Sequence, residues 1–483
     1  MSTLIDIIAE HAEKRADATA IQGADTRVSY AELDRGIAGL AEQLQRRGYQ
    51  CIGLLADNGI AWAMIDLACM RAGICCVPVP VFFSAAQREH LLRTAKIQCL
   101  IGDPEWLAQA ATLESVPLLD QVHGIGVLEL QPVVEGACHP LANVAKVTFT
   151  SGSTGQPKGV CLSQQQIDST LQALNHVIEP GTSRRHLSVL PLVTLLENIA
   201  GLYLSLLQGA EIVLKPMREI GFSGLASLDA ETFCSVIERE QPQSLILVPE
   251  LLRVLMQGVH AKAITDHQLK LIAVGGGHVA KGLLQQAAAL GLPVLQGYGL
   301  SESASVVALN GIASNRPGSV GQVLGHVQIK IADDGEILVT GNLMQGYLGE
   351  DMLTGDWLAT GDLGYLDDDG YLYVTGRKKN LLITAYGKNI SPEWVESMFL
   401  QSPCIHQLMV IGEASAQLQA VIVPAPGCQP QQVEDAVRHI NQSLPEYAQL
   451  AEYRLAATPF QFDNGLLTAN GRLRREAIRA HFA

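Results

Sequence analysis

A short run of the sequence concentrates residues suited to binding phosphate. The segment Thr148–Gly159 contains three glycines and five Ser/Thr hydroxyls around one lysine, Lys158. Glycines let backbone N–H groups approach an anion closely, hydroxyls add hydrogen-bond donors, and the lysine supplies positive charge. The apolar runs Val144–Val147 and Val160–Leu162 flank the segment, which favours a loop between strands over a Ser/Gly linker. The segment therefore predicts phosphate chemistry.

This loop is not of the Walker A type, because Pro157 stands where the second glycine is needed and Gly159 follows Lys158. It resembles instead the phosphate loop of the acyl-adenylate-forming superfamily, which includes acyl-CoA synthetases, luciferases and peptide-synthetase adenylation domains. Further segments that resemble motifs of this superfamily follow in order: Tyr298–Glu302, Thr360–Asp362, Thr375–Lys379 with Gly387–Pro392, and Asn464–Thr468 with Leu473–Arg475. On this ordered series the chain is identified as a member of the superfamily.

Elements that must position these motifs are visible in the hydrophobic pattern. Apolar runs alternate with helical patterns through residues 26–375, which is typical of α/β architecture, with a helix expected at 33–45, a strand at 52–55 and a helix at 60–72. After Tyr373 the pattern becomes α+β, with helices expected at 392–400 and 431–444 and strands at 407–411 and 419–423. The resemblance implies the adenylate-forming enzyme fold: a large N-terminal AMP-binding domain of α/β subdomains (1–376), a hinge near 377–379 and a small mobile C-terminal domain (380–483).

The resemblance also implies a reaction. A carboxylate is a poor acylating agent, because its leaving group would be oxide or hydroxide. Members of the superfamily let the carboxylate attack the α-phosphate of ATP, and a thiol then displaces AMP from the acyl-AMP; this chemistry needs positioning and charge stabilisation. We therefore expect ATP and Mg²⁺ as cofactors, a small carboxylic acid as substrate, and either CoA or the phosphopantetheine of an acyl carrier protein as the thiol.

Roles at the phosphate end follow from the matched motifs. Glu302 matches the magnesium-binding glutamate, a hard oxygen ligand suited to this ion, and Ser301 matches a threonine that contacts the α-phosphate. The predicted catalytic residues are Lys158, Glu302 and Arg472. The predicted phosphate-binding residues are Thr150, Ser151, Gly152, Ser153, Thr154, Gly155 and Lys158.

The adenosine end is assigned in the same way. Asp362 matches the aspartate that accepts hydrogen bonds from both ribose hydroxyls, a task suited to an acceptor-only carboxylate, and Arg377 matches an arginine that also contacts the ribose. Tyr298 matches the aromatic residue that stacks on adenine. Gly276 and Gly277 resemble the segment along adenine, although glycines after a strand also suit an ordinary turn. The remaining predicted residues are Gly299 at the nucleotide, Lys379 at the hinge, and Gly387 and Lys388 near the thiol.

Two positions depart from the superfamily pattern. A catalytic lysine is expected in Gly-Lys-Leu-x-Arg near the C-terminus, whereas Arg472 follows Gly471 and no lysine occurs after Lys388. Arginine keeps the positive charge but offers a broader planar fork. Slow adenylation, adenylation with altered geometry and loss of adenylation all remain open. Thr194 stands where the substrate-side motif, Pro191–Glu197 in this chain, usually carries histidine.

The acid is the least constrained part of the prediction. No Phe-Asp-x-Ser sequence lies near Pro191, so an amino acid is not expected. The apolar stretch Leu195–Leu204 suits the wall of an alkyl pocket, although apolar helix faces are also ordinary core. Since Asn464–Thr468 resembles a motif of long-chain fatty acyl-CoA synthetases, we expect a medium or long fatty acid.

Composition sets broader bounds. The 483 residues suggest two or three domains, and a net charge of −15 argues against general affinity for nucleic acid or anionic membrane. Ten cysteines without a CxxC spacing predict reduced, mostly buried thiols in a cytoplasmic protein. The N-terminal residues predict an amphipathic helix and not a signal peptide, and no transmembrane helix is expected.

Two alternatives compete with an acid-activating ligase. Arg472 and Thr194 suit an adenylate-binding regulatory protein with reduced or lost turnover. A luciferase-like oxygenase is the other alternative. Acid-dependent release of pyrophosphate from ATP distinguishes the ligase from the regulatory protein.

Overall fold

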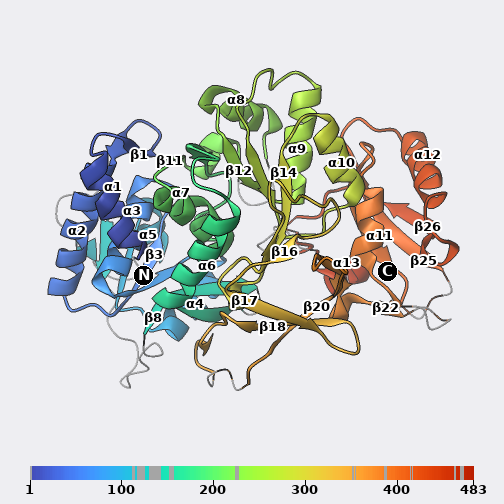
Figure 1. Cartoon of the computed structure of the whole chain (residues 1–483). Coiled ribbons are helices and arrows are strands. Elements are labelled where there is room, and N and C mark those ends of the chain that lie inside the picture. The colour runs from blue at the N-terminus through green and yellow to red at the C-terminus, as the bar shows by residue number, and fades with distance from the viewer. Residues whose placement is uncertain are drawn as a thin grey trace.

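The chain forms a large N-terminal part and a small C-terminal part, which lie side by side (Figure 1). The computed structural model describes residues 3–110, 115–116, 126–129, 143–151, 157–223, 228–350, 353, 355–383, 385, 389–413, 415, 417–461, 464–467 and 473–482. The predicted α/β class with a large N-terminal and a small C-terminal domain is confirmed. None of the helices within these ranges is long and apolar enough to cross a bilayer.

One half of the N-terminal part is built on an eight-stranded mixed sheet with the strand order β19-β9-β8-β4-β3-β5-β7-β6. Strands β3, β4 and β5 run parallel, whereas β8 and β9 form a long antiparallel hairpin that brackets the phosphate loop. The strands are β3 Cys51–Leu55, β4 Cys75–Pro78, β5 Cys99–Gly102, β6 Ser115–Val116, β7 Gly126–Glu129, β8 Val144–Ser151, β9 Pro157–Ser163 and β19 Gly346–Tyr347. Helices of this half are α1 Leu4–Lys14, α2 Tyr30–Arg46, α3 Ile60–Ala72, α4 Ala85–Ala95, α5 Pro104–Ala110 and α6 Gln164–Val177.

The other half is built on a nine-stranded sheet with the order β16-β15-β14-β13-β12-β10-β11-β1-β2. Its centre is parallel, so the ends of β12, β13 and β14 meet at one edge. The strands are β1 Thr19–Gln22, β2 Arg27–Ser29, β10 Arg185–Leu187, β11 Glu211–Val213, β12 Ser244–Leu247, β13 Leu271–Val274, β14 Val294–Tyr298, β15 Ala308–Leu309 and β16 Gln322–Val323. The helices are η1 Glu197–Tyr203, α7 Leu204–Leu207, η2 Met217–Ile220, α8 Ala230–Glu240, α9 Pro249–His260, α10 Lys281–Ala289 and η3 Ser301–Ser303.

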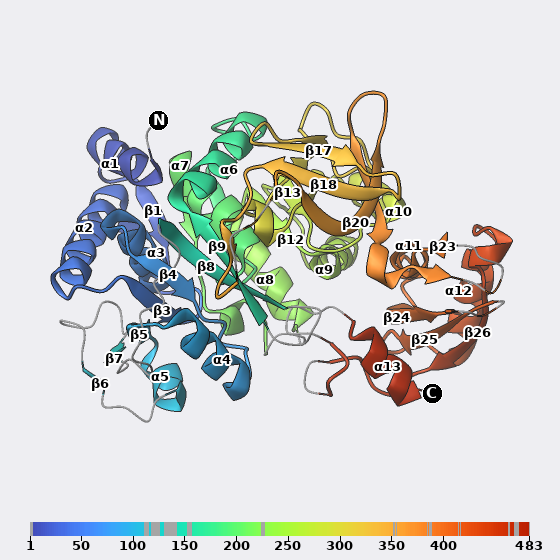
Figure 2. The same ribbon diagram turned by 90° about the horizontal axis from the view of Figure 1, so that it is seen from below.

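A four-stranded antiparallel sheet completes the N-terminal part and leads into the C-terminal part. Its strands are β17 Val327–Ile331, β18 Glu336–Gly341, β20 Leu358–Leu366 and β21 Leu372–Arg377, and the short helix η4 Lys378–Asn380 follows. The C-terminal part has its own apolar core, and Figure 2 shows it at the end of the molecule opposite α1 and α2. It contains β22 Leu382–Ile383, β23 Asn389–Ile390, α11 Pro392–Phe399, β24 Ile405–Ile411, β25 Leu418–Pro424, α12 Pro430–Asn441, η5 Glu446–Ala448, β26 Leu450–Leu455 and α13 Arg475–Phe482.

The secondary structure expected from the apolar pattern is found, with small shifts at the ends. Helix α3 has the predicted bounds and stops at Gly73, whose φ of +68° suits a glycine C-cap. Helix α2 begins earlier than the pattern indicated, because Ser29 and Glu32 form a capping box before the first apolar turn. Among the nine described cysteines, seven are buried, as predicted. The domain boundary near 377–379 and the cytoplasmic location stay predictions.

A buried ionic cluster joins the two halves of the N-terminal part. Lys146 on β8 donates hydrogen bonds to Asp66 of α3 (2.8 Å), to Asn198 (2.5 Å) and to the hydroxyl of Tyr203 (2.7 Å). Tyr203 in turn donates to Asp66, and burial raises the pKa of its phenol, which keeps this donor protonated. The side chains of Lys146 and Asp66 are 3% and 0% exposed, so each charge depends on the other partners for its solvation.

We expect Lys146→Met to lower the free energy of unfolding by about 3–5 kcal/mol, because Asp66 would remain as an uncompensated buried charge. Chemical denaturation measures the loss. The double variant Lys146→Met with Asp66→Asn removes both charges and should recover part of it. If Lys146→Met alone lowered the free energy of unfolding by less than ~1 kcal/mol, the result would contradict the role given to this cluster.

Candidate active site

A cleft of about 2850 Å³ is lined by side chains of both the N-terminal and the C-terminal part. Most of the predicted site residues that the structure describes line it: Thr150, Lys158, Gly276, Gly277, Tyr298, Gly299, Glu302, Asp362, Arg377 and Lys379. Ser301 begins η3 beside this group but does not line the cleft, and Ser151 ends strand β8. The predicted residues Gly152, Ser153, Thr154, Gly155, Gly387, Lys388 and Arg472 lie outside the described residues.

Three of the predicted nucleotide residues meet around one carboxylate. Asp362 on β20 faces Arg377 on β21, and the Arg377 Nε lies 2.7 Å from the Asp362 Oδ1. The hydroxyl of Tyr298, at the end of β14, donates to Oδ2 at 2.8 Å. Burial, together with the charge of Asp362, raises the pKa of Tyr298, so the phenol stays a donor. Two sheets are thereby joined at the position predicted to receive the ribose.

The backbone around Glu302 is unusually constrained. Ala304 and Ser305 have φ values of +51° and +91°, a region that costs non-glycine residues of order 1–3 kcal/mol each. Gly299 lies so close to the carbonyl of Ser305 that a Cβ would collide with it. The loop after β14 therefore folds tightly back on itself and leaves the Glu302 side chain at the cleft. Strained backbone of this kind is typical of functional sites.

Glu302 and Lys158 are linked through a residue that sequence reasoning missed. The hydroxyl of Tyr347 donates to the Glu302 Oε1 at 2.9 Å, and its ring lies 4.8 Å from the ammonium of Lys158. Lys158 also forms an ion pair with Glu350 at 2.7 Å. Nothing in the local sequence around Tyr347 marks this role, because it depends on contacts with Glu302 and Lys158, which are distant in the chain.

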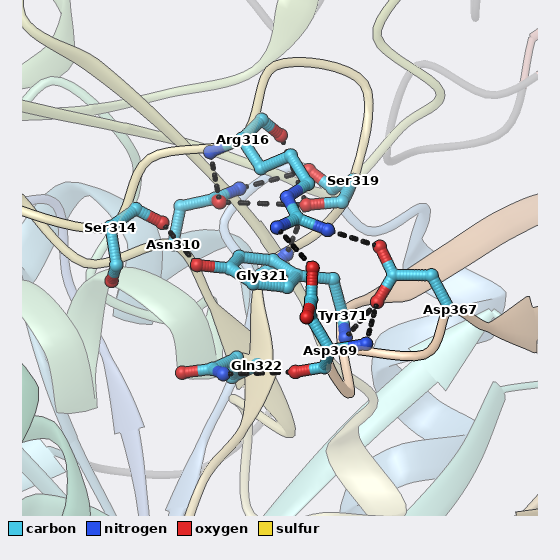
Figure 3. A network of polar contacts seen from close by, with 9 residues as sticks. All are labelled: Asn310, Ser314, Arg316, Ser319, Gly321, Gln322, Asp367, Asp369 and Tyr371. Carbon is cyan, nitrogen blue, oxygen red and sulfur yellow. Dashed lines mark hydrogen bonds and ion pairs between the residues drawn. The ribbon is translucent and has the colours of Figure 1, made fainter.

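A polar cluster holds the hairpin that carries Asp362 and Arg377. Figure 3 shows Arg316 reaching Asp367 (2.5 Å) and Asp369 (2.8 Å), with its guanidinium 4.0 Å from the ring centre of Tyr371. Asn310 fixes the same loop, since its side chain accepts from the backbone of Arg316. These contacts tie the β20–β21 turn to the loop after β15.

The apolar stretch Leu195–Leu204 proves to be mostly core and not a pocket wall. Ile199, Leu202 and Tyr203 are fully buried in the core of the N-terminal part. Only Leu196 of this stretch, with its neighbour Thr194, lines the cleft. Residues Glu197–Tyr203 of this stretch form a π-helix that is buried on almost all sides, which leaves little of it for a pocket wall.

The cleft also contains a buried polar group that the motifs did not indicate. Gln296 lines the cleft two residues before Tyr298 and is only 5% exposed. Its Oε1 has no hydrogen-bond partner among the described residues. An unpaired buried acceptor is costly, which makes this atom a candidate for contact with a ligand.

Near the C-terminus, Arg475 is anchored inside the small part. Its guanidinium makes two 2.7 Å hydrogen bonds to the carboxylate of Glu396, a fork-to-carboxylate arrangement. Burial raises the pKa of Glu396, while Arg475 and the backbone N–H of Val410 oppose that effect. Arg475 therefore serves structure, and it fixes the chain three residues after Arg472.

Comparison with known proteins supplies the family. A model described as AMP-binding enzyme matches residues 8–359, and one described as AMP-binding enzyme C-terminal domain matches residues 379–483. The chain belongs to the AMP-binding enzyme family. This confirms the predicted superfamily, and the chain is an AMP-forming ligase of the acid–thiol class, as the sequence indicates.

Relatives of this family cover the whole chain. An indoleacetate–CoA ligase of Aromatoleum aromaticum is 28% identical over 99% of this chain and 97% of its own length. A long-chain-fatty-acid–CoA ligase of Mycobacterium bovis is 25% identical over 96% of this chain and 92% of its own. Among solved structures, an anthranilate–CoA ligase with anthranoyl-AMP has a TM-score of 0.83 at 21% identity, covering 99% of this chain and 97% of its own. The o-succinylbenzoate–CoA synthetase of Bacillus subtilis with ATP and magnesium has a TM-score of 0.77 at 23% identity, covering 98% and 99%. These structures share the fold of this chain.

Proposed function

We propose that this ligase activates a hydrophobic carboxylic acid as its acyl-AMP at the expense of ATP, and then transfers the acyl group to the thiol of CoA. The observation that carries the proposal is the arrangement of Asp362, Tyr298, Glu302 and Lys158 along one cleft. The carboxylate of Asp362, which is suited to a diol such as ribose, lies at one place in the cleft. The carboxylate of Glu302 and the ammonium of Lys158, which Tyr347 links, lie at another. Binding of ATP requires both sets of groups, one for its ribose and one for its triphosphate with Mg²⁺.

The residues present fit Mg²⁺ bound together with a triphosphate. Among the described residues, no group of three or more His, Cys, Asp or Glu side chains could hold a metal alone. Magnesium commonly binds proteins through one or two carboxylates and completes its shell with substrate phosphates and water, so Glu302 is the expected protein ligand. When bound, the ion would offset the charge of the phosphate oxygens. Lys158 would hold the β- and γ-phosphates, which leave together as pyrophosphate when the carboxylate attacks the α-phosphate.

Hydrophobic acids suit the apolar part of the cleft. Trp62, Leu190, Leu196, Met217 and Phe222 line it, and they come from segments far apart in the chain. Asn58 fixes this wall, because its side-chain amide donates to the carbonyl of Leu190 and contacts the Met217 sulfur. We favour a medium or long fatty acid, on the resemblance of Asn464–Thr468. Aryl acids are the rival substrates, since relatives named for aromatic acids also match the whole chain.

A panel of acids tests the proposal directly. Fatty acids of different chain length, indoleacetate and benzoate would each be incubated with ATP, Mg²⁺ and either CoA or a loaded carrier protein, and AMP and thioester would be measured. We expect thioester with at least one hydrophobic acid, and with CoA in preference to the carrier protein. Nucleotide binding without acid-dependent AMP release would favour the regulatory alternative.

Glu302→Gln keeps the size of the side chain and removes its charge. We expect the rate of acid-dependent pyrophosphate exchange to fall by roughly 100-fold or more, the scale of losing a main electrostatic stabiliser. AMP binding, which involves neither the β- nor the γ-phosphate, should be preserved and serves as the control. An exchange rate equal to that of the parent would remove Glu302 from the site.

Arg472 stands in for the superfamily's lysine in our proposal, because a fixed positive charge beside a carboxylate that attacks a phosphate stabilises the charge that develops. We expect Arg472→Ala to slow acyl-adenylate formation strongly while a supplied acyl-adenylate is still converted to thioester. Single-turnover assays measure each half-reaction. Arg474→Ala, two residues further on, is the matched control. Adenylation at the parental rate in Arg472→Ala would refute the assignment.

The C-terminal part should rotate about η4 between the two half-reactions and bring Gly387 and Lys388 to the thiol. Support comes from the position of Lys379 in η4, where it lines the cleft between the two parts. Lys379→Pro fixes φ at the hinge, so adenylation should persist while thioester formation fails. Equal loss of both half-reactions, measured against the matched variant Lys379→Ala, would contradict a hinge at this residue.

A further inference from the structure

Tyr347 lies between the two charged groups predicted to bind the triphosphate. Its side chain contacts both: the hydroxyl bonds to one oxygen of Glu302, and the ring face lies beneath the Lys158 ammonium. A cation over an aromatic face is attracted to it, and a hydroxyl donated to a carboxylate fixes that carboxylate's orientation. One side chain thus orients a cation from strand β9 and an anion from the short helix η3.

Backbone hydrogen bonds join the segment around Tyr347 both to strand β9 and to Glu302. The N–H groups of Gln345 and Leu348 donate to the carbonyls of Cys161 (3.0 Å) and Gly159 (2.7 Å) on β9, the strand that carries Lys158. One residue earlier, the N–H of Met344 donates to the backbone carbonyl of Glu302 itself at 2.7 Å. The main chain of residues 344–348 is therefore bonded to Glu302 and to the strand that carries Lys158, while the side chain of Tyr347 contacts both residues directly.

Glu350 gives Lys158 a partner that a ligand can replace. The two side chains are 50% and 41% exposed, and ion pairs in such positions contribute little, about 0–1 kcal/mol. A polyphosphate carries several negative charges and would compete effectively for the same ammonium. Glu350 thus keeps Lys158 extended over Tyr347 without holding it tightly.

We propose that Tyr347 is a positioning residue for the triphosphate and its magnesium ion, which sets the relative placement of Lys158 and Glu302, and that Glu350 is the counter-ion that the triphosphate displaces. This inference rests on the proposed function. It assigns to Tyr347 a role in binding the β- and γ-phosphates with Mg²⁺, and none in binding AMP.

Calorimetry with a non-hydrolysable ATP analogue and Mg²⁺, compared with AMP, separates these roles. Tyr347→Phe keeps the ring and loses the bond to Glu302, so the analogue should bind about tenfold more weakly and require more Mg²⁺, the scale of a hydrogen bond to a charged group. Tyr347→Leu also loses the ring and should weaken the analogue further. AMP affinity should stay within about twofold in both variants, which lies below the effect of one such bond. Tyr447→Phe, an exposed tyrosine of the C-terminal part, is the control.

The outcomes are distinct. Parental affinity for the analogue in both Tyr347 variants would overturn the inference and leave the proposed function standing. Equal weakening of AMP and analogue in Tyr347→Phe would also overturn it, because the effect would then be general. Glu350→Gln should bind the analogue at least as tightly as the parent, and weaker binding would overturn the displacement of Glu350. A parent protein that binds neither nucleotide would overturn the proposed function together with this inference.

Discussion

The Asp362–Arg377 ion pair is the interaction on which the rest of the candidate site depends. It closes the last hairpin of the N-terminal part, and the chain enters the C-terminal part directly after Arg377. The second oxygen of Asp362 receives the hydroxyl of Tyr298 from the nine-stranded sheet. One carboxylate therefore fixes the end of β14, the direction of β21 and the start of η4. The side chain of Arg377 is 38% exposed, so a ligand can reach its guanidinium.

A second fixed point lies where Glu302 and Lys158 are held together through Tyr347 and the backbone of residues 344–348. The two sheets of the N-terminal part are joined here, and they are joined again at the buried Lys146 cluster. Rigid attachment at both places suits a site that must place sugar and phosphates of one molecule at the same time, because catalysis by positioning depends on fixed distances. The proposed rotation of the C-terminal part, which has a separate core, would take place against this fixed frame.

Much of this fold could be predicted from sequence because its elements are locally encoded. Helix α3 has the predicted bounds, since an uninterrupted apolar pattern with a clear stop signal decides them. Glu302 and Asp362 could be predicted as site residues because they belong to contiguous motifs, and both line the cleft. Tyr347 was missed, because its importance arises only when residues distant in the chain meet.

Two further differences have the same origin. The cluster of Asp66, Lys146, Asn198 and Tyr203 draws on four separate segments, and a lysine inside a strand-like run gives no local sign of burial at 3% exposure. The Leu195–Leu204 stretch is mostly core because its π-helix Glu197–Tyr203 is buried between other elements, and propensity does not encode a π-helix. Tertiary packing decided both features.

Calorimetric titration of the intact protein with AMP, 2′-deoxy-AMP and 3′-deoxy-AMP tests the central claim most directly, namely that the Asp362 carboxylate receives the ribose of the nucleotide. Each deoxynucleotide lacks one hydroxyl that a carboxylate would accept. We predict that each binds the parent protein about tenfold more weakly than AMP, the scale of one hydrogen bond to a charged group, and that the difference shrinks in Asp362→Asn. Equal affinity of the parent protein for all three nucleotides would contradict a ribose site at Asp362.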